Sequence, residues 1–324
     1  MNAARVAVLG DSFTEEQIRA MPTYSWDVAR VGDTGPPFTY LVTAESIAAY
    51  CEAVRNHNPL YLDPTVASRG PFAGIIAPPT FAFMCAPLRR NEVMHTRGFA
   101  APEEKGEYQT PYAKSELKTY RPINAGESVY SFVYLAEKYE RRGNRFITWE
   151  VRAVNGRGMP AFDYTYTIIW PDGPSTDGGS RPPAAPQPLP EIVPEDALPA
   201  ITKSESQAAI HRYSELTRVR ARIGTNLHQD PEFARRTIFG GTANTGVATA
   251  AYCAELLETA YSPAALLKPG ANIEFKAIRA IRAGDEISLT GRVTARQPRT
   301  HDCVIWVHAQ DGGLRGVATA TVVP

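Results

Sequence analysis

Two kinds of apolar pattern follow one another twice along this chain. Apolar residues three and four positions apart predict helices over residues 44–54 and 206–216. Alternating runs rich in β-branched and aromatic residues then predict strands. These runs cover 128–140, 144–154 and 160–170 in the first half, and 286–296, 301–310 and 315–323 in the second. Each half is therefore predicted to be α+β, with a helix packed on a mainly antiparallel, strongly bent sheet.

Local signals indicate where these helices begin and where the hairpins turn. Thr43 is expected to cap the first helix. Thr202, with Glu205 three residues later, is expected to form a capping box before the second helix. Asn-Gly at 155–156 and Asp-Gly at 311–312 lie between the last two strands of each half, where tight hairpins need a positive φ.

One segment breaks the apolar pattern and divides the chain. Residues 171–200 are rich in proline, glycine and small polar residues, which predicts an exposed, partly extended connector. We therefore expect an N-terminal extension over 1–35, one domain over 36–170 and a second over 201–324.

The two halves also contain similar motifs in the same order. "YLDPTVASRGPFAGIIAPPT" from Tyr61 aligns without gaps with "HQDPEFARRTIFGGTANTGV" from His228. "PINAGESV" from Pro122 aligns with "AIRAGDEI" from Ala280, and "EVRAVNG" from Glu150 aligns with "WVHAQDG" from Trp306. Three matches in register predict a duplicated fold.

Charge and cysteine content exclude several classes of function. The chain has 34 basic and 34 acidic residues, so no global field favours nucleic acid or an anionic membrane. Its four cysteines are widely spaced and are expected to be buried free thiols rather than zinc ligands. The acidic N-terminal segment and the lack of a long apolar run favour a cytoplasmic location.

With these elements in place, the chain resembles the MaoC-like (R)-specific enoyl-thioester hydratases and dehydratases in their double-hotdog form. "NHNPLYLDPTVASRGPFAGIIAPPTF" is similar to the N-terminal dehydratase domain of that family, and "LHQDPEFARRTIFGG" to its histidine-containing hydratase motif. The resemblance covers residues 36–324 and implies two tandem hotdog domains, each a bent sheet wrapped around a central helix.

The resemblance also implies a chemistry. In the family an aspartate and a histidine hold a water over the β-carbon of an enoyl thioester, while a helix N-terminus polarises the thioester oxygen. By position, the histidine is His228 and the oxyanion donor is the backbone of Gly246. The chemistry suits these groups, because a near-neutral base can deprotonate the attacking water and a helix N-terminus stabilises an enolate.

The sequence departs from the family pattern at the aspartate. Ile223 stands where the family has that residue, and the first half offers Asn56 and Tyr61 in place of the pair. Three explanations stay open: Thr225 or Asn226 orients the water beside a lone histidine base, a distant acid replaces the aspartate, or the chain binds a thioester without hydrating it. Ala254 also replaces a serine expected early in the central helix.

Other polar residues have a structural or a functional interpretation. Asp63 and Asp230 are expected to cap helices rather than carry protons, because the first half repeats the aspartate without the histidine. His57 is not expected to be catalytic. The candidate substrate-binding residues are Thr225, Thr245, Arg222, Tyr61 and Asn56, although a structural role is favoured for the last two.

Two further segments have competing interpretations. Arg218, Arg220 and Arg222 alternate and, like Arg235 and Arg236, either contact the phosphates of a carrier or form a solvated face. The apolar run 81–88 is expected to be core, although in a double hotdog the first half often forms the tunnel for an acyl tail.

The leading hypothesis is a hydro-lyase acting on a 2-enoyl or 3-hydroxyacyl thioester, with catalytic residues His228, Asn226 and Gly246. The substrate would be carried on coenzyme A or acyl carrier protein, with no cofactor, no metal, and a monomeric or homodimeric chain. The alternatives are an isomerase acting through the same enolate, which needs no water site, and a non-catalytic thioester-binding subunit. A thioesterase needs an acid on the central helix, for which Glu255 is the candidate.

Overall fold

The computed structural model describes residues 13–72, 74–171, 192–217 and 226–324. Ten strands of this described chain form one antiparallel sheet in the order β1-β3-β4-β5-β2-β7-β10-β9-β8-β6. The strands of the first half are β1 (Phe38–Leu41), β2 (Tyr112–Thr119), β3 (Ser128–Arg141), β4 (Asn144–Asn155) and β5 (Pro160–Trp170). Those of the second half are β6 (Ile201–Ser204), β7 (Ala271–Ala277), β8 (Glu286–Arg296), β9 (His301–Ala309) and β10 (Leu314–Val322).

The strand order is a mirror image about the β2–β7 junction. The order β1-β3-β4-β5-β2 is matched position for position by β6-β8-β9-β10-β7 on the other side. Strand β2 pairs with β7 through a regular antiparallel register in which Ser115 faces Phe275 and Leu117 faces Ile273. The repeat predicted from the sequence motifs is thus also a repeat of topology, and the two halves share one continuous sheet.

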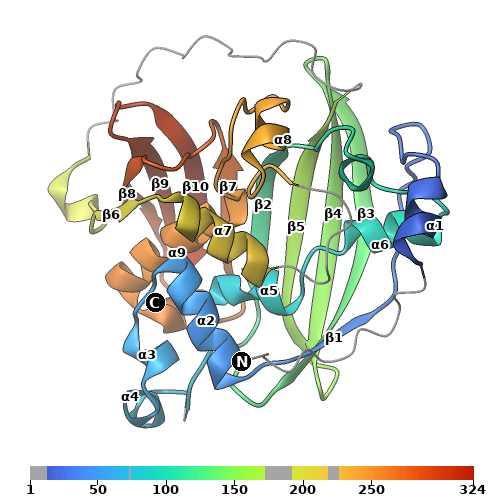
Figure 1. Cartoon of the computed structure of the whole chain (residues 1–324). Helices are drawn as coiled ribbons and strands as arrows, with labels where there is room; N and C mark the ends of the chain where they lie inside the picture. The colour runs from blue at the N-terminus through green and yellow to red at the C-terminus, as the bar shows by residue number, and fades with distance from the viewer. Residues whose placement is uncertain (1–12, 73, 172–191, 218–225) are drawn as a thin grey trace.

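The helices gather mainly on one side of this sheet (Figure 1). The first half contains α1 (Glu15–Ala20), α2 (Ala44–Val54), α3 (Pro59–Leu62), α4 (Pro64–Arg69), η1 (Pro79–Phe81), α5 (Ala82–Cys85), α6 (Arg90–Thr96) and η2 (Pro102–Lys105). The second half contains η3 (Pro194–Asp196), α7 (Gln207–Leu216), α8 (Pro231–Arg235), α9 (Gly246–Tyr261) and η4 (Pro263–Leu266). None of the helices in the described ranges is long and apolar enough to cross a lipid bilayer.

The central helix differs greatly between the halves. Helix α9 has 16 residues, and its alanine, cysteine and leucine side chains are buried against the sheet. The corresponding part of the first half is the short η1 followed by α5, which has four residues. Phe81, Phe83 and Cys85 are nevertheless buried there, which confirms that this apolar run is core.

Most of the predicted boundaries are confirmed. All six predicted strands are present within one or two residues of the expected limits, and all four cysteines are buried free thiols. Thr43 caps α2 by accepting from the N–H of Ser46. Both aspartate caps are confirmed: Asp63 accepts from Thr65 and Val66, and Asp230 accepts from Glu232 and Phe233.

Two local predictions are wrong. Thr202 is paired in β6 with Ser288 and caps no helix, so α7 begins later, with Ser206 accepting from the N–H of Ala209. In the first hairpin the positive φ of 73° falls at Gly158 rather than at 155–156, because the turn is longer than a two-residue one. Gly312, with φ of 73°, confirms the second hairpin.

Acidic side chains of α9 are buried where the two halves meet. Asn56 donates to Oε2 of Glu258 at 2.8 Å, and Glu258 is only 6% exposed. Burial raises the pKa of Glu258 to about 7, although hydrogen bonds from Asn56 and Tyr61 act in the opposite direction. One turn earlier, Glu255 pairs with Nζ of Lys203 at 2.6 Å. The interface between the halves therefore contains carboxyl groups held in a dry environment.

Replacing Glu258 by glutamine should flatten the pH dependence of stability. The folded state holds the proton of Glu258 more tightly than the unfolded chain, so this group's contribution falls as pH rises from about 4.5 through about 7. Each tenfold change in proton affinity is about 1.4 kcal/mol, so the total loss is on the order of 3 kcal/mol. Urea unfolding at a series of pH values should show Glu258→Gln losing less stability than the wild type toward alkaline pH. The exposed Glu16→Gln is the matched control, and equal slopes for all three proteins would contradict the prediction.

Candidate functional site

A cavity of about 1300 Å³ lies beside the N-terminus of α9 and crosses the junction of the two halves. The second half contributes the turn before α8, the first residues of α9 and the segment after β7. The first half contributes β2, β5 and the segments around α6 and η2. The residues used below that line the cavity are Phe83, Leu88, Arg90, Glu103, Gln109, Thr110, Tyr112, Phe146, Tyr166, Ile168, His228, Thr245, Gly246, Val247, Arg279, Arg282 and Arg315.

His228 lies half-buried in the wall of this cavity. Its Nδ1 lies 2.7 Å from the backbone carbonyl oxygen of Ala243. Because a carbonyl oxygen can only accept, Nδ1 carries the proton, and the neutral ring has its lone pair on Nε2. A backbone carbonyl therefore fixes the tautomer of His228, which is a task that a carboxylate often performs for a catalytic histidine.

Asn226 stabilises the turn that carries His228. Its Oδ1 accepts from the N–H of His228 at 2.9 Å, and its Nδ2 donates to Gln229 at 3.1 Å. Asn226 is 2% exposed, and the part of the cavity wall formed by described residues does not include it. The structure thus gives Asn226 a role in positioning the histidine backbone.

Helix α9 begins at Gly246, and its first turn lines the cavity. Thr245 is the N-cap and accepts from the N–H of Ala248 at 3.3 Å. The N–H groups of Gly246 and Val247 lie in the first turn of α9, so the helix has no carbonyl one turn earlier to accept from them. They are donors at the positive end of the helix dipole. A Cβ at Gly246 would come within 2.2 Å of the Tyr112 ring, which explains why this position needs glycine.

Gln207 links the two parts of the site. Its Nε2 donates to the carbonyl of His228 at 3.0 Å, and its Oε1 accepts from the hydroxyl of Thr242 at 2.6 Å. One side chain at the start of α7 therefore holds the histidine turn against the segment that leads into α9.

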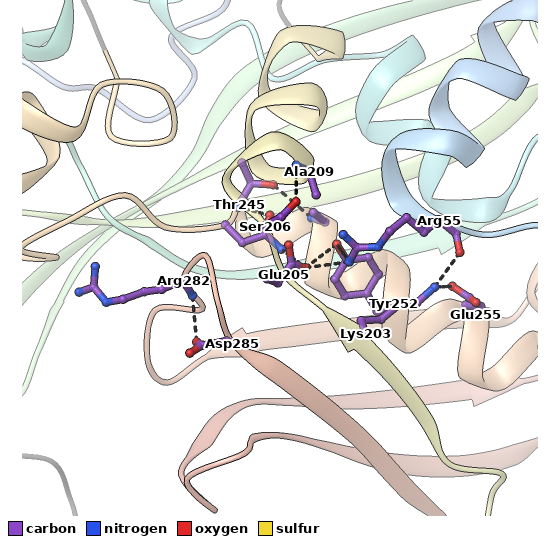
Figure 2. Close-up of polar contacts among 12 residues, drawn as sticks. Arg55, Lys203, Glu205, Ser206, Ala209, Thr245, Tyr252, Glu255, Arg282 and Asp285 are labelled. Carbon is purple, nitrogen blue, oxygen red and sulfur yellow. Dashed lines mark hydrogen bonds and ion pairs between the residues drawn. The ribbon is translucent and has the colours of Figure 1, made fainter.

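Glu205 fixes the same segment from its other side. Its buried Oε1 accepts from Nη2 of Arg55 at 3.0 Å and from the hydroxyl of Tyr252 at 2.7 Å (Figure 2). Nδ2 of Asn244 donates to the same oxygen at 3.2 Å, while Oδ1 of Asn244 accepts from the N–H of Thr245. The carboxylate thereby connects a cation from the first half to the N-cap of α9.

The other candidate binding residues lie elsewhere. Tyr61 and Asn56 are buried beside Glu258 on the later turns of α9, and neither lines the cavity as far as the described chain forms it. Their structural interpretation thus has a physical basis, because they cover a buried carboxyl group. Thr225 and Arg222, together with Arg218, Arg220 and Ile223, lie outside the described residues. Thr245 is the remaining candidate, and it lies at the cavity.

The residues considered only as alternatives have other surroundings. Glu255 forms an ion pair with Lys203, and it does not line the cavity among the described residues. Glu255 is therefore not placed there as the acid that a thioesterase needs. His57 is exposed, as are Arg235 and Arg236. Ala254 is buried within α9.

Sequence reasoning missed three arginines at the second-half end of the cavity. Arg279 and Arg282 follow β7, and Arg315 lies on the adjacent strand β10. Arg315 pairs with Asp311 at 2.9 Å, and Nη1 of Arg282 donates to the carbonyl of Thr242 at 3.4 Å. The signal available in the sequence was "AIRAIRAG", whose second part overlaps the second repeat match. Among the described residues, no group of three or more His, Cys, Asp or Glu side chains is placed to hold a metal ion.

Comparisons with known proteins agree with this architecture. Residues 29–164 match the family model described as the FAS1-like dehydratase domain region. A UPF0336 protein of Saccharopolyspora erythraea is 27% identical over 145 residues, which is 44% of this chain and 90% of that protein. Another UPF0336 protein, from Streptomyces avermitilis, is 45% identical over 103 residues, or 31% of this chain and 65% of the relative.

Solved structures share the fold along nearly the whole chain. A protein described as a MaoC-like dehydratase has a TM-score of 0.74 at 19% identity, covering 91% of this chain and 98% of its own. Rv0216 of Mycobacterium tuberculosis, described as having a double hotdog fold, has a TM-score of 0.61 at 13% identity, covering 93% and 98%. These likenesses confirm the predicted fold class, two tandem hotdogs in one chain.

The protonation of His228 can be tested directly by NMR. The Ala243 carbonyl should hold the neutral imidazole as the Nδ1–H tautomer. Long-range ¹H–¹⁵N correlation spectra recorded above the titration range should show Nδ1 as the protonated nitrogen. Comparison with His228→Gln would assign the signals, and a predominant Nε2–H pattern for His228 would contradict the geometry.

Proposed function

We propose that this chain adds water to a 2-enoyl thioester or removes water from a 3-hydroxyacyl thioester, because it shares the fold of a solved protein described as a MaoC-like dehydratase and matches the model of a dehydratase domain region. The acyl group would be carried on coenzyme A or on the phosphopantetheine arm of a carrier protein. The observation that carries the proposal is that an oriented histidine and a helix N-terminus line the same cavity.

In the hydration direction, Nε2 of His228 accepts a proton from water as the water oxygen bonds to the β-carbon. Electron density moves to the thioester oxygen, where the N–H groups of Gly246 and Val247 stabilise the enolate. His228 then returns the proton to the α-carbon, which completes the addition of H and OH across the double bond. Dehydration follows the same steps in reverse, and the thioester itself delocalises the charge, so the reaction needs no redox or metal group.

The Ala243 carbonyl supports a lone-histidine mechanism without the aspartate of the family. Orientation and tautomer selection are two of the tasks of an acid beside a catalytic histidine, and a carbonyl can perform both. The carbonyl carries only a partial charge, however, so it stabilises the imidazolium less than a carboxylate does. We therefore expect the same type of reaction at a lower rate, rather than a different reaction.

The sheet order supports an orientation for the substrate. Tyr112 on β2 packs against Gly246 and marks the reacting centre. The arginines on the β7–β10 side favour the phosphates of the carrier, whereas Tyr166, Ile168 and Phe146 on β5 and β4 offer apolar surface to the acyl group.

Crotonyl-CoA provides the first test of the reaction. Wild-type protein should decrease the ultraviolet absorbance of the conjugated thioester, and His228→Ala should lower the rate by roughly 10²–10⁴-fold because the general base is lost. The melting temperature and the affinity for butyryl-CoA should change little.

Each alternative gives a distinct result in this experiment. Movement of the double bond without addition of water, detected by mass spectrometry, would indicate the isomerase. Binding of butyryl-CoA without any turnover in the wild type would indicate a thioester-binding subunit.

Gln207→Leu should affect positioning rather than binding. Loss of its two hydrogen bonds frees the His228 turn from Thr242, so kcat should fall roughly 10- to 100-fold, while KM changes much less. Steady-state kinetics with crotonyl-CoA measure both constants. The exposed Gln297→Leu is the matched control, and a Gln207 variant with normal kcat but raised KM would show that the residue contacts substrate instead.

A further inference from the structure

A buried ion pair forms the wall of the cavity on the first-half side. Nη2 of Arg90 lies 2.7 Å from Oε1 of Glu103, and Nη1 of Arg90 donates to the hydroxyl of Thr110. Both charged side chains are 13% exposed, and all three residues line the cavity. We call Arg90, Glu103 and Thr110 the polar wall.

The polar wall lies on the acyl side of the reacting centre. Helix α6, which begins at Arg90, packs against β3, on the opposite side of β2 from the arginines of the β7–β10 end. Gln109, which precedes Thr110, accepts from the N–H of Leu227 at 3.0 Å, next to His228. The polar wall and His228 thus line the same cavity, and a hydrogen bond joins the segments that carry them.

Apolar side chains also line the part of the cavity that the first half forms. Phe83, Leu88, Tyr166 and Ile168 line this stretch. An acyl chain that extends from the thioester along β5 would bury its methylene groups there and bring its far end to Arg90.

The chemistry of the wall selects the kind of group that can end there. Glu103 balances the charge of Arg90, so a carboxylate gains no net attraction. The guanidinium has five N–H donors, and the two bonds above leave further donors for a ligand oxygen. A methyl group would displace water from these donors without replacing its hydrogen bonds, which is costly.

We propose that the acyl substrate carries a neutral hydrogen-bonding group, such as a hydroxyl or keto oxygen, at the end that meets the polar wall. This inference rests on the proposed function only in taking an acyl thioester as the ligand. It assigns Arg90 as the residue that determines specificity for the far end of the acyl chain.

Binding of saturated thioesters tests this inference separately from catalysis. Calorimetry would compare acyl-CoA pairs of matched length, from butanoyl to octanoyl, ending in a methyl, a hydroxyl or a carboxylate. At the length that reaches the wall, the hydroxyl form should bind about tenfold more tightly than the methyl form, as expected for one hydrogen bond to a charged group. The carboxylate form should show no such gain.

A double variant provides the matched comparison. Arg90→Leu with Glu103→Leu removes both charges together and so leaves no unpaired buried charge. It should bind the methyl form at least as tightly as the hydroxyl form, and its melting temperature reports whether it is folded. Glu103→Gln removes the negative charge that balances Arg90, so the variant should bind the carboxylate form more tightly than the wild type does.

Each outcome bears on one proposal. A wild-type preference for the methyl or carboxylate form at every length would overturn the polar-wall inference, as would a hydroxyl preference that persists in the double variant. Failure to bind any of these thioesters would also overturn it. Normal binding preference without turnover of the enoyl forms would leave the inference supported and contradict the hydro-lyase function.

Discussion

The buried carboxylate of Glu205 is the contact on which the geometry of this molecule most depends. One oxygen receives hydrogen bonds from Arg55 in the first half, Tyr252 in the middle of α9, and Asn244 beside the α9 N-cap. Removing this carboxylate would take away the ion-pair partner of Arg55 and the acceptor of three hydrogen bonds. The same contact therefore joins the two repeats and holds the donors of the helix N-terminus at the cavity.

Much of the fold follows from local sequence patterns. The alternating runs that became β3 and β8 are half-buried on a pleated sheet, so over most of their length burial alternates with the sequence pattern. The motif match between the halves predicted a duplicated fold, and the family resemblance pointed to His228 and Gly246, which both line the cavity. Both residues lie beside features that the sequence indicates. His228 precedes a helix that Asp230 caps, and Gly246 ends a run of small residues that leads into α9.

The remaining features depend on contacts between distant segments. Thr202 and Glu205 have the spacing of a capping box. In the structure, however, Thr202 pairs with β8, and Glu205 accepts a hydrogen bond from Arg55, which lies 150 residues earlier. Strand β2 was not predicted because its sequence, "YAKSELKT", contains three charged residues and has no clear apolar alternation. Its pairing with β7 joins the two halves and is not visible in the local sequence. The contact between the His228 ring and the Ala243 carbonyl was also unpredictable, since a backbone carbonyl leaves no signature in the choice of residue.

The two repeats differ at the positions that correspond to His228 and Gly246. In the gapless alignment of the motifs, Pro79 occupies the position of Gly246, and proline has no N–H to donate to an oxyanion. The helix that follows Pro79 is short, and Tyr61, aligned with His228, is buried beside Glu258. The proposed base and the proposed oxyanion donor of the second half therefore have no counterpart in the first half. The first half instead supplies Arg55 to the buried network and the apolar and charged walls to the cavity, which makes the single site a product of both repeats.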